Sequence, residues 1–356
     1  MKSILFIGHE FHQKTKSSNF ILDLLSNEYS IDKFFIDPDI DNSFKELTGK
    51  TYDILILWQV MPSISKLKNI IKFNHCAFFP MYDNTKTLNS QLWSEYTDCN
   101  IINFSKAFHN TCKNAGLSSY YIQYFPKPIE ISDMGDEHSI FFWQRSEKIT
   151  TKTLEKLIST EHINKLYLHK SPDPKNKFIE PSKQWKDKVI YSSWFNTKHE
   201  MQEYIQKSAL YIAPRKYEGI GMSFLEAMAA GRCVIAPNYP TMNEYIVNGE
   251  TGYLYNLKRP KKIRLNNIRK IQKKTLEYIK EGYKHWEQDK YKILEYIESK
   301  PNIDINKINE YIYLKNIKTK ILGFIPTKIK QTRNYTKYEI LNFIPLRFNH
   351  PKSKNP

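Results

Sequence analysis

The sequence predicts an α/β protein with two doubly wound domains that face each other across a cleft. The chain has 356 residues, which is enough for two domains that each bury a core. Short, continuous apolar runs alternate with helical patterns, as in parallel sheets covered by helices on both faces. This alternation pauses near residue 125 and restarts after residue 138. The pause indicates two successive α/β units, with ligands expected at the cleft between them.

The first domain is predicted over residues 1–130. Its first strand is the apolar run near the N-terminus, which is short and reaches no small-residue cleavage site, unlike a signal peptide. Ser17 or Ser18 is expected to cap the first helix. The expected elements are strands at 3–7, 53–58, 75–80 and 100–105 and helices at 19–25 and 106–115.

The second domain is predicted over residues 139–258. It follows a stiff, proline-containing segment at 125–128 and a polar stretch at 132–138. The expected elements are strands at 139–143, 165–168, 188–191, 210–213 and 233–236 and helices at 151–159, 198–208 and 222–229.

Two basic segments are predicted after the second domain. Residues 259–300 are expected to be a basic helical segment, and residues 301–356 a basic amphipathic tail. In the tail the apolar run at 321–326 recurs at 340–345, and Lys or Arg follows each copy within a few residues. Apolar side chains that enter a lipid interface beside cations that meet anionic head groups bind membranes. The alternatives for the tail are a solvated face and a nucleic-acid patch, but the repeated apolar segments favour binding to an anionic membrane surface.

Composition limits the class of protein. Hydrophobic residues make up 40% of the chain and charged residues 26%, as in globular proteins, and no run of eighteen apolar residues predicts a transmembrane helix. The four cysteines are scattered and form no CxxC pair, so neither a disulfide framework nor a zinc site is expected, and a reducing cytoplasm is favoured. The net charge of +17 indicates an anionic partner, which is nucleic acid, phospholipid or a phosphate-bearing substrate.

Residues 213–255 carry the predicted chemistry. A strand ends there in a loop in which Gly219 and Gly221 allow the backbone to approach a ligand closely. The apolar helix that follows offers unpaired N–H groups and a partial positive charge at its start, which suits a phosphate. Glu218 and Glu226 are placed to accept hydrogen bonds from hydroxyl groups on either side of that phosphate. A phosphate flanked by polyols describes a nucleotide sugar.

The two glutamates form an E-x7-E motif inside EGIGMSFLEAMAAG, and GETGYLY follows about twenty residues later. This pattern resembles the retaining glycosyltransferases of family four, which have two Rossmann-like domains (the GT-B fold). The resemblance is specific over residues 209–256 and looser towards the N-terminus. It implies that Glu218 contacts the transferred sugar and acts in catalysis, and that Glu226 contacts the ribose hydroxyls. It also implies that the donor meets the loop at Gly219, Ile220, Gly221 and Met222.

The same resemblance implies an Arg and a Lys that bind the donor diphosphate after the first strand of the second domain. The loop FFWQRSEKITTKTL offers Arg145 and Lys148, with Lys152 as a substitute because the loop is shorter than is usual. Two fixed cations would stabilise the charge on the departing nucleoside diphosphate, so Arg145 is also assigned a catalytic role. Neither a metal nor another cofactor is then expected.

The acceptor side is predicted from residues after strands of the first domain. His9 and His12 follow the first strand and are expected to face the cleft. His75, Asp83 and His109 compete for the position beside the transferred sugar. Asp83 is favoured because it follows the carboxyl end of its strand, whereas His75 is expected to precede that strand.

Three further features have open interpretations. Glu244 contacts a substrate or is an ordinary solvated helix residue. The Asp-Pro-Asp sequence at 37–39 is interpreted as a turn rather than a metal site. Loops near Ser193 and Trp194 are expected to set the preference for the nucleotide base.

Together these features predict a retaining glycosyltransferase. It would transfer a sugar from a nucleoside-diphosphate sugar to a glycan or lipid-linked acceptor in bacterial O-antigen, capsule or lipooligosaccharide synthesis. The family mechanism implies that a donor phosphate oxygen helps to deprotonate the acceptor hydroxyl. The protein is expected in the cytoplasm, on the inner face of the cytoplasmic membrane, without a specific nucleic-acid partner. The alternatives are a nucleotide-sugar epimerase of the same fold and a basic nucleic-acid-binding protein without enzymatic activity.

Overall fold

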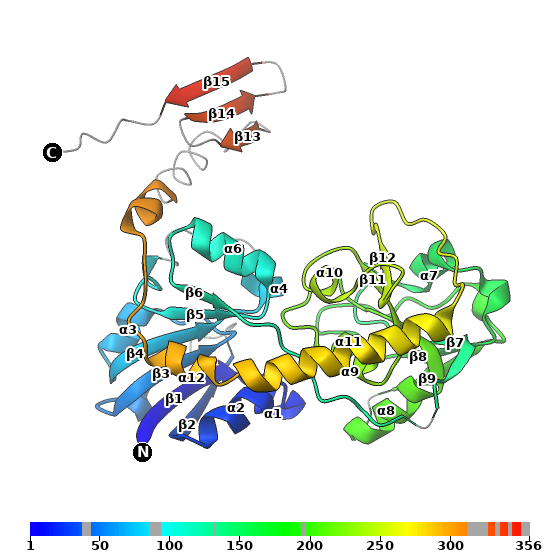
Figure 1. The fold of residues 1–356 in the computed structure, drawn as a ribbon, viewed down its shortest axis with the longest axis horizontal. Coiled ribbons are helices and arrows are strands. Elements are labelled where there is room, and N and C mark those ends of the chain that lie inside the picture. Colours follow the sequence, from blue (N-terminus) through cyan, green and yellow to red (C-terminus); the bar gives the residue numbers. More distant parts are fainter. Residues whose placement is uncertain are drawn as a thin grey trace.

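The computed structural model confirms two parallel α/β sheets (Figure 1). It describes residues 1–37, 44–85, 94–131, 133–193, 195 and 197–311, together with the backbone of three strands further on. The two six-stranded sheets use strands from the first 121 residues and from residues 136–255, respectively.

The first sheet has the strand order β2-β1-β3-β4-β5-β6, and all of its pairings are parallel. The order reverses between β1 and β3, so the ends of these two strands form the switch point at which doubly wound sheets bind ligands. Its strands are β1 (Lys2–His9), β2 (Tyr29–Ile36), β3 (Thr51–Trp58), β4 (Lys72–Phe79), β5 (Asn100–Asn103) and β6 (Ser119–Tyr121). Its helices are α1 (Phe11–Thr15), α2 (Asn19–Ser26), α3 (Ile64–Lys68), α4 (Tyr82–Thr85) and α6 (Lys106–Asn114), with a 3-10 turn at Lys45–Leu47.

The second sheet has the strand order β12-β11-β10-β7-β8-β9, again with parallel pairings. Here the switch point lies between β7 and β10. Its strands are β7 (Asp136–Trp143), β8 (Lys165–His169), β9 (Val189–Ser192), β10 (Ser208–Ile212), β11 (Cys233–Pro237) and β12 (Gly252–Tyr255). Its helices are α7 (Thr151–Leu157), α8 (Lys198–Gln206), α9 (Met222–Ala229) and α10 (Met242–Tyr245), with 3-10 turns at Thr160–His162 and Lys183–Trp185.

The sequence patterns found the central strands and missed three edge strands, β2 and β6 of the first sheet and β12 of the second. Strands β1 and β3 are almost wholly buried, and their continuous apolar runs identified them. β2 and β6 lie at the two edges of the first sheet, and most of their residues are only partly buried or exposed. An edge strand needs no continuous apolar run, so its sequence gives a weaker signal.

Two local expectations are wrong. Ser18 lies at the N-cap of α2, but its side chain makes no capping hydrogen bond, and the Ser17 hydroxyl bonds the His12 ring instead. His75 lies within β4, not before it. It therefore belongs to the first half of the strand, away from the carboxyl edge of the sheet.

The basic segment after the second sheet returns to the first one. Helix α11 (Ile268–Asp289) packs on α9 and β11, and α12 (Lys292–Glu298) packs on β4 and β5 (Figure 1). Gly282 lies against the Phe125 ring, where a side chain would overlap the ring. Glu298 Oε1 accepts a 2.6 Å hydrogen bond from the Tyr29 hydroxyl. The predicted helical segment is thus helical only from residue 268, and it joins the two sheets.

No disulfide framework was expected, and the structure contains one disulfide. Cys76 in β4 and Cys99, just before β5, form a disulfide. The two strands are neighbours, and Ala77 pairs with Asn100 in register, so Cys76 and Cys99 lie side by side. Cys112 and Cys233 are buried and free.

Some predicted features lie outside the described residues. These are positions 38 and 39 of the expected turn, Trp194, and the first copy of the tail repeat at 321–326. In the tail, β13 (Thr327–Gln331), β14 (Tyr335–Ile340) and β15 (Ile344–Asn349) pair as an antiparallel sheet. Within the described part of the chain, no helix is both long and apolar enough to span a membrane.

Candidate functional site

The candidate site lies at the carboxyl ends of β7, β8 and β10, three adjacent strands of the second sheet. Arg145 follows β7, Asp173 follows β8, and Arg215 and Glu218 follow β10. Because parallel strands end at the same edge of a sheet, these four charged side chains are brought together. The four residues come from three loops that are far apart in the sequence, and these loops meet because their strands are neighbours in the sheet.

Glu218 is the most buried of these groups. Its side chain is 6% exposed, and its Oε1 atom has no hydrogen-bond partner among the described residues. Burial raises the pKa of Glu218 to about 7, against the opposing effect of the Arg215 and Arg145 charges. A buried carboxylate oxygen without a partner is costly, and this atom can accept a hydrogen bond from a donor that enters the site.

Asp173 joins the two arginines. Its Oδ1 atom accepts a 2.8 Å hydrogen bond from Nε of Arg145 and forms an ion pair with Nη2 of the same residue, also at 2.8 Å. Its Oδ2 atom accepts hydrogen bonds from Nε and Nη2 of Arg215, at 3.0 and 2.6 Å. Arg145 also stacks over the Trp143 ring, with its guanidinium carbon 4.6 Å from the ring centroid. Both guanidinium groups are therefore fixed in position.

Asp83 brings the first domain to this cluster. It lies on α4, after β4, and its Oδ2 atom is 3.5 Å from Nη1 of Arg215. Gly219 passes directly against the same helix region, because a Cβ on it would lie 2.9 Å from Met81 Cβ and 3.1 Å from Asp83 Oδ1. The glycine expected to approach a ligand thus also makes a close contact between the two domains. Asp83 is brought together with Arg215, and His75 and His109 are not.

The loop and helix carrying the E-x7-E motif have the expected form. Gly221 is the N-cap of α9 with φ +88°, and a side chain there would overlap the Phe224 ring. Ile220 is buried, and its carbonyl accepts a 3.1 Å hydrogen bond from the Thr241 hydroxyl. Met222 begins α9 and is partly buried. The start of the helix is thus held in one conformation beside Glu218.

Glu226 lies on α9, one turn after its start, and is partly buried. Burial has the largest effect on the pKa of Tyr124 and raises it, and the negative charge of Glu226 raises it further. Glu226 therefore lies near Tyr124, on the segment between the two sheets. Glu218 and Glu226 therefore lie on successive parts of one loop and helix, as the motif requires.

Lys148 is not brought to the cluster. It lies in a tight turn closed by a bridge between Ser146 and Ile149, and its side chain is exposed, as is that of Lys152. Among the described residues, Lys148 makes no ion pair with the charged groups around Glu218. The cation that accompanies Arg145 in this structure is Arg215.

His9 and His12 lie at the switch point of the first sheet. His12 Nε2 is 2.7 Å from Oε1 of Gln59, which follows β3 and has φ +67°. A non-glycine residue in this region is strained and is held by its surroundings. Burial lowers the pKa of His12. Nδ1 of His9 accepts a hydrogen bond from the Phe11 N–H at 3.2 Å.

Glu244 has a role that the sequence did not reveal. It extends from α10 of the second domain to the N-terminus of α6 in the first domain. Its carboxylate accepts hydrogen bonds from the Ser105 hydroxyl at 3.0 Å and from the N–H groups of Lys106 and Ala107 at 2.7 and 3.0 Å. Glu244 is thus a helix cap that joins the two domains, not a solvated residue.

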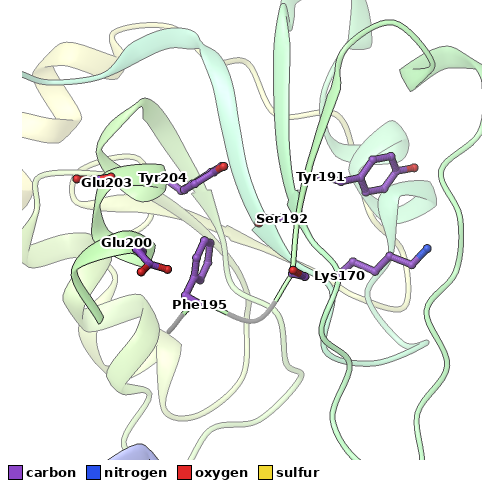
Figure 2. A pocket seen from close by; sticks show the side chains of 8 residues that line it. Lys170, Tyr191, Ser192, Phe195, Glu200, Glu203 and Tyr204 are labelled. Atoms are coloured by element: carbon purple, nitrogen blue, oxygen red, sulfur yellow. The ribbon is translucent and has the colours of Figure 1, made fainter. Parts of the chain in front are cut away.

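A cavity of about 520 Å³ adjoins the second sheet at the ends of β8 and β9. Figure 2 shows Phe195 and Glu200 on one side of it and Lys170 and Tyr191 on the other. The His169 ring stacks on the Phe195 ring, with centroids 4.5 Å apart. The other lining residues are Ser192, Ser193, Glu203 and Tyr204. The region predicted to choose a nucleotide base is therefore hollow.

Comparison with known proteins finds a family model that matches part of the chain. Residues 177–285 match the model of the family described as glycosyl transferases group 1. One curated relative, an uncharacterised 41.2 kDa protein in the cps region of Klebsiella pneumoniae, is 32% identical over 78 residues. That match spans 22% of this chain and only 22% of the relative.

Solved structures share the fold. The sucrose-phosphate synthase of Thermosynechococcus elongatus is 14% identical, with a TM-score of 0.59 over 83% of this chain and 98% of that one. Anabaena Alr3699/HepE, solved in complex with UDP and glucose, is 12% identical, with a TM-score of 0.50 over 89% of this chain and all of that one. The chain therefore has the GT-B fold of two Rossmann-like domains, as the resemblance implied.

Proposed function

We propose that this chain, which carries a glycosyl transferases group 1 domain on a GT-B fold, is a retaining glycosyltransferase that uses a nucleoside-diphosphate sugar. One observation carries the proposal. Among the residues that the structure describes, Glu218 presents a buried carboxylate oxygen without a hydrogen-bond partner, at the switch point of the second domain and beside two fixed arginines. A hydroxyl-rich, anionic ligand meets both needs, because its hydroxyl groups donate to Glu218 while its phosphates meet the cations.

The donor is proposed to lie with its diphosphate at the start of α9. The N–H groups of the first helical turn point towards this position, and Gly219 to Met222 form its approach. Arg145 stabilises the negative charge that develops on the departing nucleoside diphosphate. Glu226 then accepts hydrogen bonds from the ribose hydroxyls. The Anabaena protein of the same fold was solved with UDP and glucose, which supports a donor of this class.

The base is proposed to enter the cavity after β8 and β9. Phe195 and Glu200 line it on one side and Lys170 lies opposite (Figure 2), and Ser193 also lines it. Aromatic rings suit a planar base, and the polar side chains around them supply hydrogen-bond partners. Lys170, which lines the cavity, precedes Asp173 of the charged cluster by three residues.

The reaction is proposed to proceed with retention and without a metal. A phosphate oxygen of the donor helps to deprotonate the acceptor hydroxyl while the bond between the sugar's anomeric carbon and the diphosphate breaks. The acceptor oxygen bonds to that carbon on the face that the diphosphate leaves, and the nucleoside diphosphate departs with the proton. Asp83, at the edge of the first domain, lies where it can orient the acceptor or the transferred sugar. Arginines, rather than a divalent cation, neutralise the leaving group, and no other cofactor is proposed.

The acceptor is proposed to be a glycan or lipid-linked intermediate of a bacterial surface polysaccharide. The Klebsiella relative belongs to a cps region, which supports this class of pathway. His9 and His12, at the switch point of the first sheet, are proposed to face the acceptor. The basic tail would hold the protein at an anionic membrane surface on the cytoplasmic side.

A thermal-shift screen tests the donor site. The purified protein is heated with UDP, GDP, CDP or ADP and with their common sugar derivatives. We expect one nucleotide to raise the melting temperature, and Arg145→Ala and Glu226→Ala to remove most of that shift. Folded wild-type protein that shows no shift with any of them would count against a nucleotide-sugar transferase.

A further inference from the structure

We infer that Arg215, together with Arg145, forms the cation pair that binds the donor diphosphate, in the place for which the sequence pointed to Lys148. This inference rests on the proposed nucleotide-sugar donor. The resemblance placed both cations in the loop after β7, whereas this inference assigns the second one to the loop after β10.

The geometry of the two guanidinium groups is the first argument. Asp173 engages the same edge of each, through Nε and Nη2. A guanidinium group carries five N–H donors in a planar fork. The edge formed by Nη1 and the second N–H of Nη2 is thus directed away from Asp173 in both residues. A single carboxylate therefore sets the orientation of two cations and leaves donors of each for another anion.

The surroundings of Arg215 are the second argument. Its side chain is 30% exposed, so it is neither fully covered nor loose on the surface. It lies three residues before Glu218, on the same loop that leads into α9. Nη1 of Arg215 is 3.5 Å from Oδ2 of Asp83, which is longer than a direct hydrogen bond. A phosphate oxygen would compete well for this group because charge-assisted contacts to phosphate are short and strong.

The placement of Lys148 is the third argument. Its turn is closed by the bridge between Ser146 and Ile149, and its ammonium group is exposed. In the part of the chain that the structure describes, Lys148 makes no ion pair with the cluster, whereas Arg215 is already fixed there by Asp173. The shorter loop after β7 thus loses its second cation, and the loop after β10 supplies one.

The experiment measures the contribution of the second phosphate. Isothermal titration compares each nucleoside diphosphate (UDP, GDP, CDP and ADP in turn) with the corresponding monophosphate, for the wild type and for variants of the full chain. The variants are Arg215→Gln, Arg215→Lys, Lys148→Gln and Lys216→Gln. Lys216→Gln is the matched control because it removes one positive charge from the adjacent residue, whose ammonium lies over the Tyr217 and Tyr239 rings.

We expect Arg215→Gln to weaken diphosphate binding on the order of tenfold to a hundredfold, with a much smaller effect on the monophosphate. Arg215→Lys should recover only part of the loss, because a point charge does not reproduce the planar fork. Lys148→Gln and Lys216→Gln should retain the wild-type difference between diphosphate and monophosphate.

The inference is overturned if Lys148→Gln removes that difference, a result that does not depend on whether Arg215→Gln folds. It is also overturned if folded Arg215→Gln keeps the wild-type difference. In both cases the wild type still binds a diphosphate, so the proposed function stands. If the wild type binds no nucleotide at all, the proposed function fails, and the inference fails with it.

Discussion

At the scale of single residues, the site depends on a carboxyl group kept away from water. Glu218 is buried beside two arginines, yet burial has the largest effect on its pKa, which rises to about 7. The neighbouring carboxylates Asp83 and Asp173 act in the same direction as burial. Part of the arginine charge is thus already neutralised, and Glu218 remains close to the boundary between its two protonation states near neutral pH.

Substitution of Glu218 by Gln should make stability less dependent on pH. The pKa of Glu218 rises from 4.5 to about 7 on folding, so the folded state holds a proton that the unfolded state releases between these values. Stability of the wild type therefore falls as pH rises through this window. Glu218→Gln avoids the buried charge and should be more stable by up to about 3 kcal/mol above pH 7, and by little at pH 4.5. Urea unfolding at several pH values measures this, and a constant difference across the range would contradict it.

Substitution of Gly221 by alanine should clearly lower the stability of the protein. Its φ of +88° disfavours a side chain, and a Cβ there would also overlap the Phe224 ring. Gly249 is a matched control, since its φ is +79° but no atom lies within 4 Å of the added Cβ. Backbone strain alone costs about 1 kcal/mol, so Gly249→Ala should lose about that much stability and Gly221→Ala clearly more. Chemical unfolding of both variants measures the difference, and equal losses would contradict the packing argument.

At the scale of elements, helix ends connect the two domains. Helix α6 of the first domain receives its capping carboxylate from Glu244 of the second. Gln123, on the segment that leaves the first sheet, donates a 3.0 Å hydrogen bond to the Glu244 carbonyl. A change in the angle between the domains would break these bonds. The cap is therefore sensitive to the arrangement of the domains as well as to the helix itself.

Glu244→Ala should lower stability by about 1–2 kcal/mol, the usual cost of a lost helix cap. It should also alter the small-angle scattering profile, because the first domain loses a contact with the second. Thr197→Ala is the control, since Thr197 caps α8 within the second domain by accepting a 3.2 Å hydrogen bond from the Glu200 N–H. It should lower stability without changing the profile. Identical scattering changes in both variants would exclude a specific role for Glu244 between the domains.

At the scale of the whole molecule, α11 and α12 lead the chain from the second domain back to the first sheet (Figure 1). The side-chain amide of Asn100, at the start of β5, donates 2.7 Å hydrogen bonds to the carbonyls of Tyr296 and Ser299. Ile308, further along, is buried in the core of the first domain. The two sheets are thus joined twice, by the segment between β6 and β7 and by the helices α11 and α12.

The tail beyond Tyr311 should act in membrane binding and not in folding. Truncation after Tyr311 retains the packing of α12 and Ile308. The shortened protein should keep its melting temperature but lose sedimentation with vesicles that contain anionic phospholipid. The full chain should bind these vesicles less well at high salt, and neutral vesicles weakly at any salt. Equal sedimentation of both proteins would contradict this role for the tail.

The sequence by itself determined the local elements and the motif. Buried strands such as β1 and β3 are continuous apolar runs because both faces of a parallel sheet are covered. Glu218, Gly221 and Glu226 belong to one loop and helix, so their spacing fixes their relation without help from distant residues. The Arg145 loop could be assigned from the family resemblance because it directly follows a strand.

Only the tertiary structure decided which distant side chains meet. Arg215 and Asp173 are 42 residues apart, and Cys76 and Cys99 are 23 apart. Glu244 reaches a helix that begins 138 residues earlier. Local patterns reflect backbone hydrogen bonding and the burial of one chain segment, whereas these contacts depend on strand order and on how the two domains pack. A pattern over neighbouring residues contains neither quantity. The resemblance therefore pointed to Lys148, whereas the fold places Arg215 beside Arg145.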